Sequence, residues 1–213
     1  MGADRPKQYL QLGGQTLLER SLRCLLADAR VSRVLVVFAA DDQRAARVPL
    51  PARCERLAAG GATRAQTVRN GLRALQAQAG AQDWVLVHDA ARPCLGADEL
   101  AELIDGAGID EHGGLLAVPL SDTVKREEHG RVAATVERAG LWRAMTPQFF
   151  RIDVLARALE ASADLDSVTD ESAAVERLGL RPRLIAGRAG NIKVTTPEDL
   201  ALAEAILRQR GCW

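Results

Sequence analysis

The chain has 213 residues, 47% of them hydrophobic and 26% charged, which fits one globular domain that buries a full core and excludes a disordered chain. Basic and acidic residues balance at 28 each, so no overall field attracts nucleic acid or a membrane surface. The cysteines show no CxxC spacing, and neither a signal peptide nor an apolar run of membrane-spanning length occurs, so we expect a protein of the reducing cytoplasm.

Helical and strand patterns alternate along the first half of the chain. Thr16 and Glu19 form a capping-box pair ahead of leucines that share one helical face, which predicts a helix over about 16–28. The apolar run 33–39 is typical of a strand buried on both faces. The same unit then recurs, with predicted helices over 64–78 and from about 98, and predicted strands over 84–87 and 114–118. This alternation predicts an α/β fold, a three-layer sandwich with a mostly parallel sheet.

A charged segment, 121–143, interrupts the alternation. It contains a turn at His129–Gly130 followed by β-prone residues, which predicts a hairpin arm. Because such an arm has little core of its own, we expect it to form a homodimer interface. The remaining chain predicts a helix near 153–161, a helix after Thr169, a strand at 184–185 and a last helix with Thr196 as N-cap and Pro197 at its first position. We therefore expect a single domain over 1–213 with 121–143 as a dimerisation arm.

Lysine is rare in this chain, since only Lys7, Lys125 and Lys193 among its 28 basic residues are lysines. A retained lysine therefore calls for an explanation by its position. Lys193 lies directly before the last predicted helix, where the helix dipole disfavours a cation, so its position indicates an anion between them. Lys125 lies in the charged arm and is interpreted as solvated. Lys7 precedes the first helix, and on its own residues it fits an ordinary basic tail better than a site.

Two segments have the composition of an anion-binding site. The turn 60–64 is rich in glycine and ends in Arg64 at a helix start, so it can offer N–H groups and a guanidinium to an anion, although such turns also simply connect a strand to a helix. Asp89 and Arg92 follow a predicted strand directly, where open α/β sheets bind ligands. Asp89 could hold a ribose hydroxyl or lie near Mg²⁺, and Arg92 could bind a phosphate; the alternative is an internal ion pair between them. His88 is interpreted as a packed or hydrogen-bonded histidine.

Several motifs occur in series from Pro6 to the end of the chain. They are PKQY, the GG-x-x-R turn, VHDAARPC, ER-x-GLW at the end of the arm, TPQFF, TDE at 169–171 and NIKVTTPEDL. In this order they resemble the 2-C-methyl-D-erythritol 4-phosphate cytidylyltransferases, and a series is far more specific than one glycine pattern. The resemblance implies a Rossmann-like nucleotidyltransferase fold. It also implies transfer of CMP from CTP to 2-C-methyl-D-erythritol 4-phosphate in the non-mevalonate isoprenoid pathway, with release of pyrophosphate and formation of 4-diphosphocytidyl-2-C-methyl-D-erythritol.

The resemblance also implies roles for individual residues and Mg²⁺ as cofactor, with no protein metal ligand assigned. Lys7 is expected to stabilise the α-phosphate in the transition state, and Lys193 to position the attacking phosphate from one side. Arg138 and Thr123 are expected to do so from the partner's arm. The other expected substrate-binding residues are Gly61, Arg64 and Thr67 around the nucleotide, Asp89, Ala90 and Arg92 where nucleotide and acceptor meet, Thr146 at the base of the arm, and Thr169.

This sequence departs from the family at one point. The family opens with a strand and a glycine-rich loop, PAAGxGxRM, around the CTP phosphates, and this sequence begins at the methionine. A helix without a preceding strand would also lack its crossover partner. We therefore expect weak CTP binding by the sequence as it stands, and recovery of turnover when an upstream strand and loop are restored.

The same residues leave two other functions open and exclude a third. The alternatives are a cytidylyltransferase for another polyol phosphate, such as ribitol 5-phosphate, and a non-catalytic nucleotide-binding module. A dinucleotide-dependent oxidoreductase is excluded because no G-x-G-x-x-G is followed by an acidic residue about 20 positions later.

Overall fold

The computed structural model describes residues 6–162 and 164–212, and its largest sheet has the strand order β10-β6-β9-β5. These strands are β5 (Trp84–Val87), β6 (Gly114–Pro119), β9 (Trp142–Arg151) and β10 (Arg183–Ala186). β10 is parallel to β6, whereas β9 is antiparallel to both β5 and β6, so three strands run one way and β9 runs against them. The α/β prediction is confirmed, but β9 was not predicted as a strand and makes the sheet mixed.

The predicted helices are confirmed within a few residues of their expected ends. They are α1 (Leu17–Leu26), α2 (Arg64–Gln76), α3 (Ala97–Ala107), α4 (Ile152–Ala161), α5 (Glu171–Glu176) and α6 (Pro197–Gln209). The capping box expected at Thr16 is formed, and Thr196 is the N-cap of α6 as expected, in a capping box with Asp199. Short 3₁₀ turns, η1 (Lys7–Tyr9) and η2 (Ala45–Arg47), complete the helical elements. No helix in the described ranges combines the length and apolar character that crossing a membrane requires.

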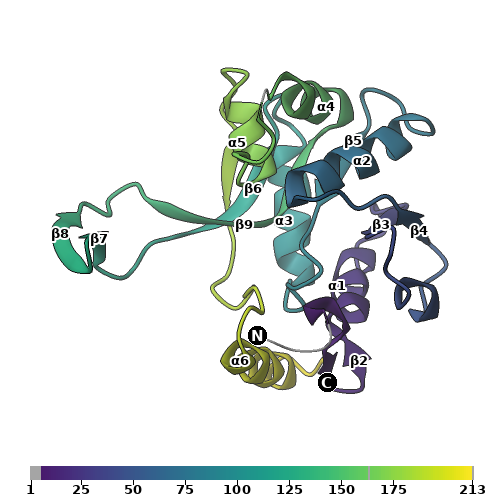
Figure 1. Ribbon diagram of the computed structural model, residues 1–213, viewed down its shortest axis with the longest axis horizontal. Coiled ribbons are helices and arrows are strands. Elements are labelled where there is room, and N and C mark those ends of the chain that lie inside the picture. Colours follow the sequence, from purple (N-terminus) through teal and green to yellow (C-terminus); the bar gives the residue numbers. More distant parts are fainter. Residues whose placement is uncertain (1–5, 163, 213) are drawn as a thin grey trace.

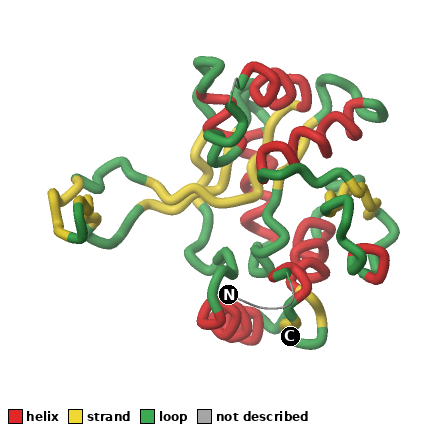
Figure 2. Tube along the Cα trace, viewed as in Figure 1, coloured by secondary structure: helices red, strands yellow, loops and turns green. Residues whose placement is uncertain are grey.

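Two hydrophobic clusters cover the two faces of the large sheet. On one face Phe150 packs with residues of α2, α4 and α5. On the other face Met145 and Phe149 pack with residues of α3 and the end of α1. Because side chains alternate across a strand, consecutive residues of β9 serve both clusters, and β9 is buried from Met145 to Phe150. The expected three layers are thus present, and Figures 1 and 2 show the helices around the strands.

A cavity divides the sheet that was expected to be continuous. β3 (Val34–Phe38) pairs in parallel with β4 (Cys54–Ala58) and forms a separate sheet. Between β3 and β5 lies a cavity of about 320 Å³, lined largely by apolar side chains of both strands and of α1 and α2. In the described part of the chain, β3 and β5 each pair with a strand on one side only. Each therefore has an unpaired edge, and these two edges are the ones that border the cavity.

The predicted arm is confirmed as a hairpin. β7 (Val124–Glu128) pairs antiparallel with β8 (Arg131–Val136), and His129 and Gly130 between them both have positive φ, as a tight hairpin turn requires. Figure 1 shows the hairpin projecting well away from the body of the protein. A small hairpin of β1 (Gln11–Leu12) and β2 (Gln15–Thr16) precedes α1.

Candidate functional site

Three cations from separate segments surround the carboxylate of Asp89, two residues beyond β5. Nζ of Lys193 lies 2.9 Å from Oδ2, and Nε of Arg64 donates to Oδ1 at 3.1 Å. Nε of Arg92 lies 3.8 Å from Oδ2, so the ion pair considered as the alternative exists but is the longest of the three. The sequence predicted each of these residues as part of the site, and the structure brings all four together at the carboxyl end of a sheet strand.

The charge of Asp89 is set by these neighbours. Burial alone would raise the pKa of its carboxyl, but Arg64 and Lys193 outweigh burial and lower the pKa to about 2. Asp89 is therefore ionised throughout the neutral range. Its side chain is only 13% exposed, whereas that of Lys193 is 40% exposed. The Lys193 side chain consequently remains partly exposed to solvent although it contacts a largely buried carboxylate.

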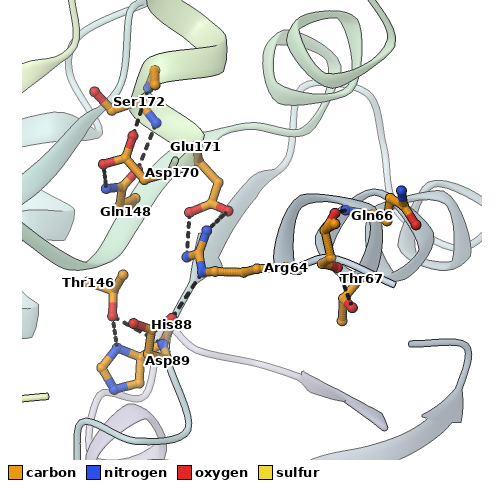
Figure 3. A network of polar contacts seen from close by, with 12 residues as sticks. Arg64, Gln66, Thr67, His88, Asp89, Thr146, Gln148, Asp170, Glu171 and Ser172 are labelled. Carbon is orange, nitrogen blue, oxygen red and sulfur yellow. Dashed lines mark hydrogen bonds and ion pairs between the residues drawn. The ribbon is translucent and has the colours of Figure 1, made fainter. Parts of the chain in front are cut away.

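The glycine turn holds Arg64 close to the end of β3. The side chain of Thr63 caps α2 by accepting from the N–H of Gln66, and Oγ1 of Thr67 accepts from the N–H of Gly61 at 3.0 Å. A Cβ on Gly61 would lie 2.4 Å from Cβ of Gln66, so only glycine fits there. The N–H of Gly61, which was considered as a donor to an anion, thus donates to a side chain of α2. Figure 3 shows Gln66 and Thr67 beside Arg64 at the start of α2.

A second carboxylate, which sequence reasoning had not selected, lies on the far side of Arg64. The two carboxylate oxygens of Glu171 accept from Nη1 and Nη2 of Arg64 at 2.6 and 2.8 Å (Figure 3). Glu171 is 1% exposed, and burial raises the pKa of its carboxyl while Arg64 opposes that shift. In the sequence, Glu171 belongs to the TDE motif, but only Thr169 of that motif was expected to bind substrate. A buried acid cannot be recognised from such a motif alone.

A chain of hydrogen bonds fixes the backbone around Asp89. Oγ1 of Thr146 accepts from the N–H of Asp89 at 3.1 Å and lies 3.1 Å from Nδ1 of His88. Nε2 of His88 lies 3.2 Å from the carbonyl oxygen of Arg92, which can only accept, so Nε2 carries the proton and Nδ1 accepts from Thr146. The prediction that His88 is a hydrogen-bonded histidine is confirmed, and Thr146 acts at the base of the arm as a support of this loop.

The segment that carries Lys193 is tied to the same loop. Nη1 of Arg92 donates to the carbonyl of Asn191 at 2.7 Å, and Nδ2 of Asn191 donates to the carbonyl of Thr146 at 3.0 Å. The N–H of Val194 donates to the carbonyl of Ala91 at 2.8 Å. These bonds explain why Lys193 reaches Asp89 although more than a hundred residues separate them in the sequence.

Other expected site residues lie apart from this cluster. Lys7 is exposed in η1 and takes part in no ion pair within the described residues. Thr123 and Arg138 are exposed on the arm, which projects away from the body (Figure 1). Thr169 is exposed beside α5. Ala90, in contrast, directly follows Asp89, and its carbonyl accepts from the Ser21 hydroxyl at 3.0 Å. Within one chain, therefore, the expected contributions of the arm and of Lys7 make no ion pair with Asp89, in contrast to Lys193.

A protonated His88 would be a buried cation and could no longer accept from Thr146. Burial accordingly lowers the pKa of His88 to about 4, below its ordinary value of 6.5. As the pH falls below 6.5, His88 becomes protonated in the unfolded chain but stays neutral in the folded chain until the pH nears 4, so the unfolded state is favoured. We expect this residue to remove about 2 kcal/mol from the free energy of unfolding between pH 7 and pH 5.

Urea unfolding of the wild type, His88→Gln and His129→Gln at both pH values measures this contribution. His129→Gln changes an exposed histidine of the arm and should keep the wild-type pH dependence. For His88→Gln, the drop in the free energy of unfolding between pH 7 and pH 5 should be smaller than in the wild type by about 2 kcal/mol. Equal pH dependence in all three proteins would show that His88 titrates normally in the fold.

Comparison with known proteins gives the family. The family model described as 2-C-methyl-D-erythritol 4-phosphate cytidylyltransferase matches residues 1–209. A protein of that name from Laribacter hongkongensis is 59% identical over 210 residues, covering 97% of this chain and 90% of the relative. Another from Dechloromonas aromatica is 50% identical over 213 residues, covering 98% of this chain and 92% of the relative.

Solved structures agree with the sequence matches. A crystal structure described as 4-diphosphocytidyl-2C-methyl-D-erythritol synthase has a TM-score of 0.88 at 45% identity and covers 94% of each chain. The 2-C-methyl-D-erythritol 4-phosphate cytidylyltransferase of Francisella tularensis has a TM-score of 0.85 at 31% identity, covering 96% of this chain and 94% of that one. The resemblance carried by the motifs is thus confirmed, and the chain belongs to the 2-C-methyl-D-erythritol 4-phosphate cytidylyltransferase family.

Proposed function

We propose that this chain transfers CMP from CTP to 2-C-methyl-D-erythritol 4-phosphate at the cluster around Asp89, giving 4-diphosphocytidyl-2-C-methyl-D-erythritol and pyrophosphate. Family membership supports the reaction, and the convergence of Arg64, Arg92 and Lys193 on Asp89 supports the place. Transfer between phosphates requires several anionic oxygens to be neutralised and aligned at once. A cluster rich in arginine and lysine at the end of a strand is suited to that work.

The reaction needs no protein nucleophile. An oxygen of the acceptor phosphate attacks the α-phosphorus of CTP, the bond from that phosphorus to the pyrophosphate oxygen breaks, and pyrophosphate leaves with the bonding electrons. In this proposal the half-exposed Lys193 exchanges its contact with Asp89 for the attacking phosphate. Arg64 faces the nucleotide phosphates, and Arg92 holds the loop of Lys193 through Asn191. Alignment and charge neutralisation are then the main sources of catalysis.

Mg²⁺ is the proposed cofactor. Within the described ranges no group of three His, Cys, Asp or Glu side chains gathers as a metal site of its own. The donors present still fit this ion, because Mg²⁺ usually takes one or two carboxylates and completes its shell with waters and substrate phosphates, and Asp89 is an ionised carboxylate at the site. Bound there with CTP, it would neutralise charge on the phosphate oxygens.

A homodimer through the arm is the proposed assembly, with 121–143 extending from a single nucleotidyltransferase domain. A two-stranded hairpin is marginal when isolated, and this one exposes Val132 at 65% of its surface, with Leu141 and Trp142 partly exposed at its base. On a partner, Thr123 and Arg138 would complete the other subunit's site.

A cytoplasmic location is proposed as well. All four cysteines are free thiols, which fits a reducing compartment.

Pyrophosphate release tests the function directly. With 2-C-methyl-D-erythritol 4-phosphate as acceptor, CTP should react faster than UTP or ATP, because contacts to the polar edge of the base distinguish cytosine. With CTP as donor, this acceptor should react faster than ribitol 5-phosphate. Equal rates with UTP would contradict the base assignment, and faster turnover of ribitol 5-phosphate would change the substrate.

The two lysines outside η1 offer a matched comparison. Lys193 contacts Asp89, whereas Lys125 donates to Oγ1 of Thr135 on the exposed arm. Lys193→Ala should lower kcat/KM by about a hundredfold or more, since it removes a charge that faces the reacting phosphates. Lys125→Ala should stay within about twofold of the wild type. Comparable losses in the same pyrophosphate assay would remove Lys193 from the reaction.

The shared-site arrangement is tested by mixing variants. If Lys7 and Arg138 act together only across the two-fold axis, Lys7→Ala and Arg138→Ala homodimers are both inactive. Free exchange should give about half heterodimers, each with one doubly altered site and one intact site, and thus roughly a quarter of wild-type activity. Native mass spectrometry confirms the exchange. A mixture as inactive as its parents after exchange would place Arg138 within its own chain's site or outside it.

A further inference from the structure

Arg64 is held from two sides by acids of the chain itself. Its Nε donates to Asp89 at 3.1 Å, while Nη1 and Nη2 donate to the two oxygens of Glu171. A bidentate pair with a carboxylate fixes the plane of a guanidinium as well as its position. Figure 3 shows Arg64 between these two acids. Its side chain is nevertheless 34% exposed, so these contacts do not enclose it completely.

Glu171 is itself fixed by a strand of the large sheet. Asp170 caps α5 by accepting from the N–H of Ala173 at 2.9 Å. Gln148 of β9 accepts from the N–H of Ser172 at 2.8 Å and donates to Asp170 at 2.9 Å, and Gln148 is 1% exposed. The first turn of α5 is therefore bound to β9 on both sides of Glu171 (Figure 3).

The same strand supports the other acid. Thr146, two residues before Gln148, accepts from the N–H of Asp89. Thr146 and Gln148 lie on either side of Pro147, where the register of β9 with β6 is irregular, and both belong to the buried part of the strand. The backbone of Asp89 and the first turn of α5, which carries Glu171, are thus hydrogen-bonded to one buried segment of β9.

We infer that Glu171 is a positioning residue for nucleotide binding, because it sets the orientation in which Arg64 meets the CTP phosphates. The inference rests on the proposed function, in which Arg64 faces the nucleotide. Glu171 is not placed on the substrate. It acts through Arg64. The hydrogen bonds of the buried Gln148 to Asp170 and Ser172 hold the helix start that carries Glu171 in place.

Charge and position make opposite predictions for this acid. Arg64, Arg92 and Lys193 carry three positive charges against the two negative charges of Asp89 and Glu171. If Glu171 acted only through its charge, neutralising it would make the cluster more positive and strengthen the binding of an anion. If it acts by orienting Arg64, neutralising it weakens binding in spite of the added positive charge.

Isothermal titration calorimetry with CTP and steady-state kinetics on Glu171→Gln separate the two. We expect the CTP dissociation constant and the KM for CTP to rise about tenfold, because an amide cannot make the paired charge-assisted bonds. Glu171→Asp, which keeps the charge but shortens the reach, should also weaken binding. Tighter or unchanged CTP binding by Glu171→Gln would overturn the inference, as would wild-type binding by Glu171→Asp.

The matched control is Glu176→Gln, which removes the same charge from the exposed end of the same helix, where Glu176 contacts Ser172 and not Arg64. It should bind CTP within about twofold of the wild type. An equal loss in Glu176→Gln would mean that the effect belongs to the helix as a whole, against the inference. Far-UV circular dichroism and urea midpoints verify that each variant is folded.

A double-mutant cycle with Arg64→Lys completes the test. Lysine cannot make the bidentate bonds, so Glu171→Gln should add little to the loss already caused by Arg64→Lys. Additive losses would show that Glu171 acts elsewhere. If Arg64→Lys alone leaves CTP binding unchanged, it is the nucleotide role of Arg64 in the proposed function that fails. If Arg64→Lys weakens binding and Glu171→Gln does not, only the positioning role fails.

Discussion

The ionised carboxylate of Asp89 is the contact on which the arrangement of the site depends. It binds Arg64 at the start of α2, Arg92 in its own loop and Lys193 ahead of α6, segments that the fold brings together from distant parts of the sequence. Three cations at such short range would repel one another without it, and the pKa of about 2 shows how strongly they favour its charged form. A phosphate ligand can take over part of that neutralisation, which makes a cluster of this kind suited to exchanging an internal anion for a substrate.

Lys193 shows how this internal anion changes the interpretation of the sequence. A lysine just before a capped helix indicated a bound anion, and the structure places the Asp89 carboxylate 2.9 Å from its ammonium. The negative charge that the helix-dipole argument called for near Lys193 is present as a carboxylate of the chain itself, and a bound anion at Lys193 stays a prediction. Any phosphate that binds Lys193 must compete with Asp89, which links affinity to how firmly Asp89 is held by Arg64 and by the Thr146 hydroxyl.

Local signals explain what could be predicted from the sequence. The capping residues Thr16 and Thr196 predicted where helices begin, and short apolar runs predicted the strands. Asp89 and Arg92 could be predicted as site residues because they directly follow the strand β5. β9 was missed because it contains Pro147, which argues against an interior strand, and because its pairing with β5 and β6 involves residues far apart in sequence. Glu171 and Gln148 were missed for a related reason: their roles come from burial against that same strand, and a single sequence does not reveal burial of a polar residue.

β9 therefore connects two features that the sequence presented as separate. Its first residues, from Trp142, are exposed where they pair with β6 at the base of the arm. The strand is buried from Met145 to Phe150, and it pairs with β5 from Gln148 onward. Thr146 and Gln148, which hold the Asp89 loop and the start of α5, come directly after this transition. At Gln148 the strand has pairing partners on both sides, Val87 of β5 and Leu115 of β6, which fixes it in the sheet. The element that fixes where the arm leaves the body is thus also the element that fixes the two acids around Arg64, so the direction of the arm and the geometry of the site have one structural origin.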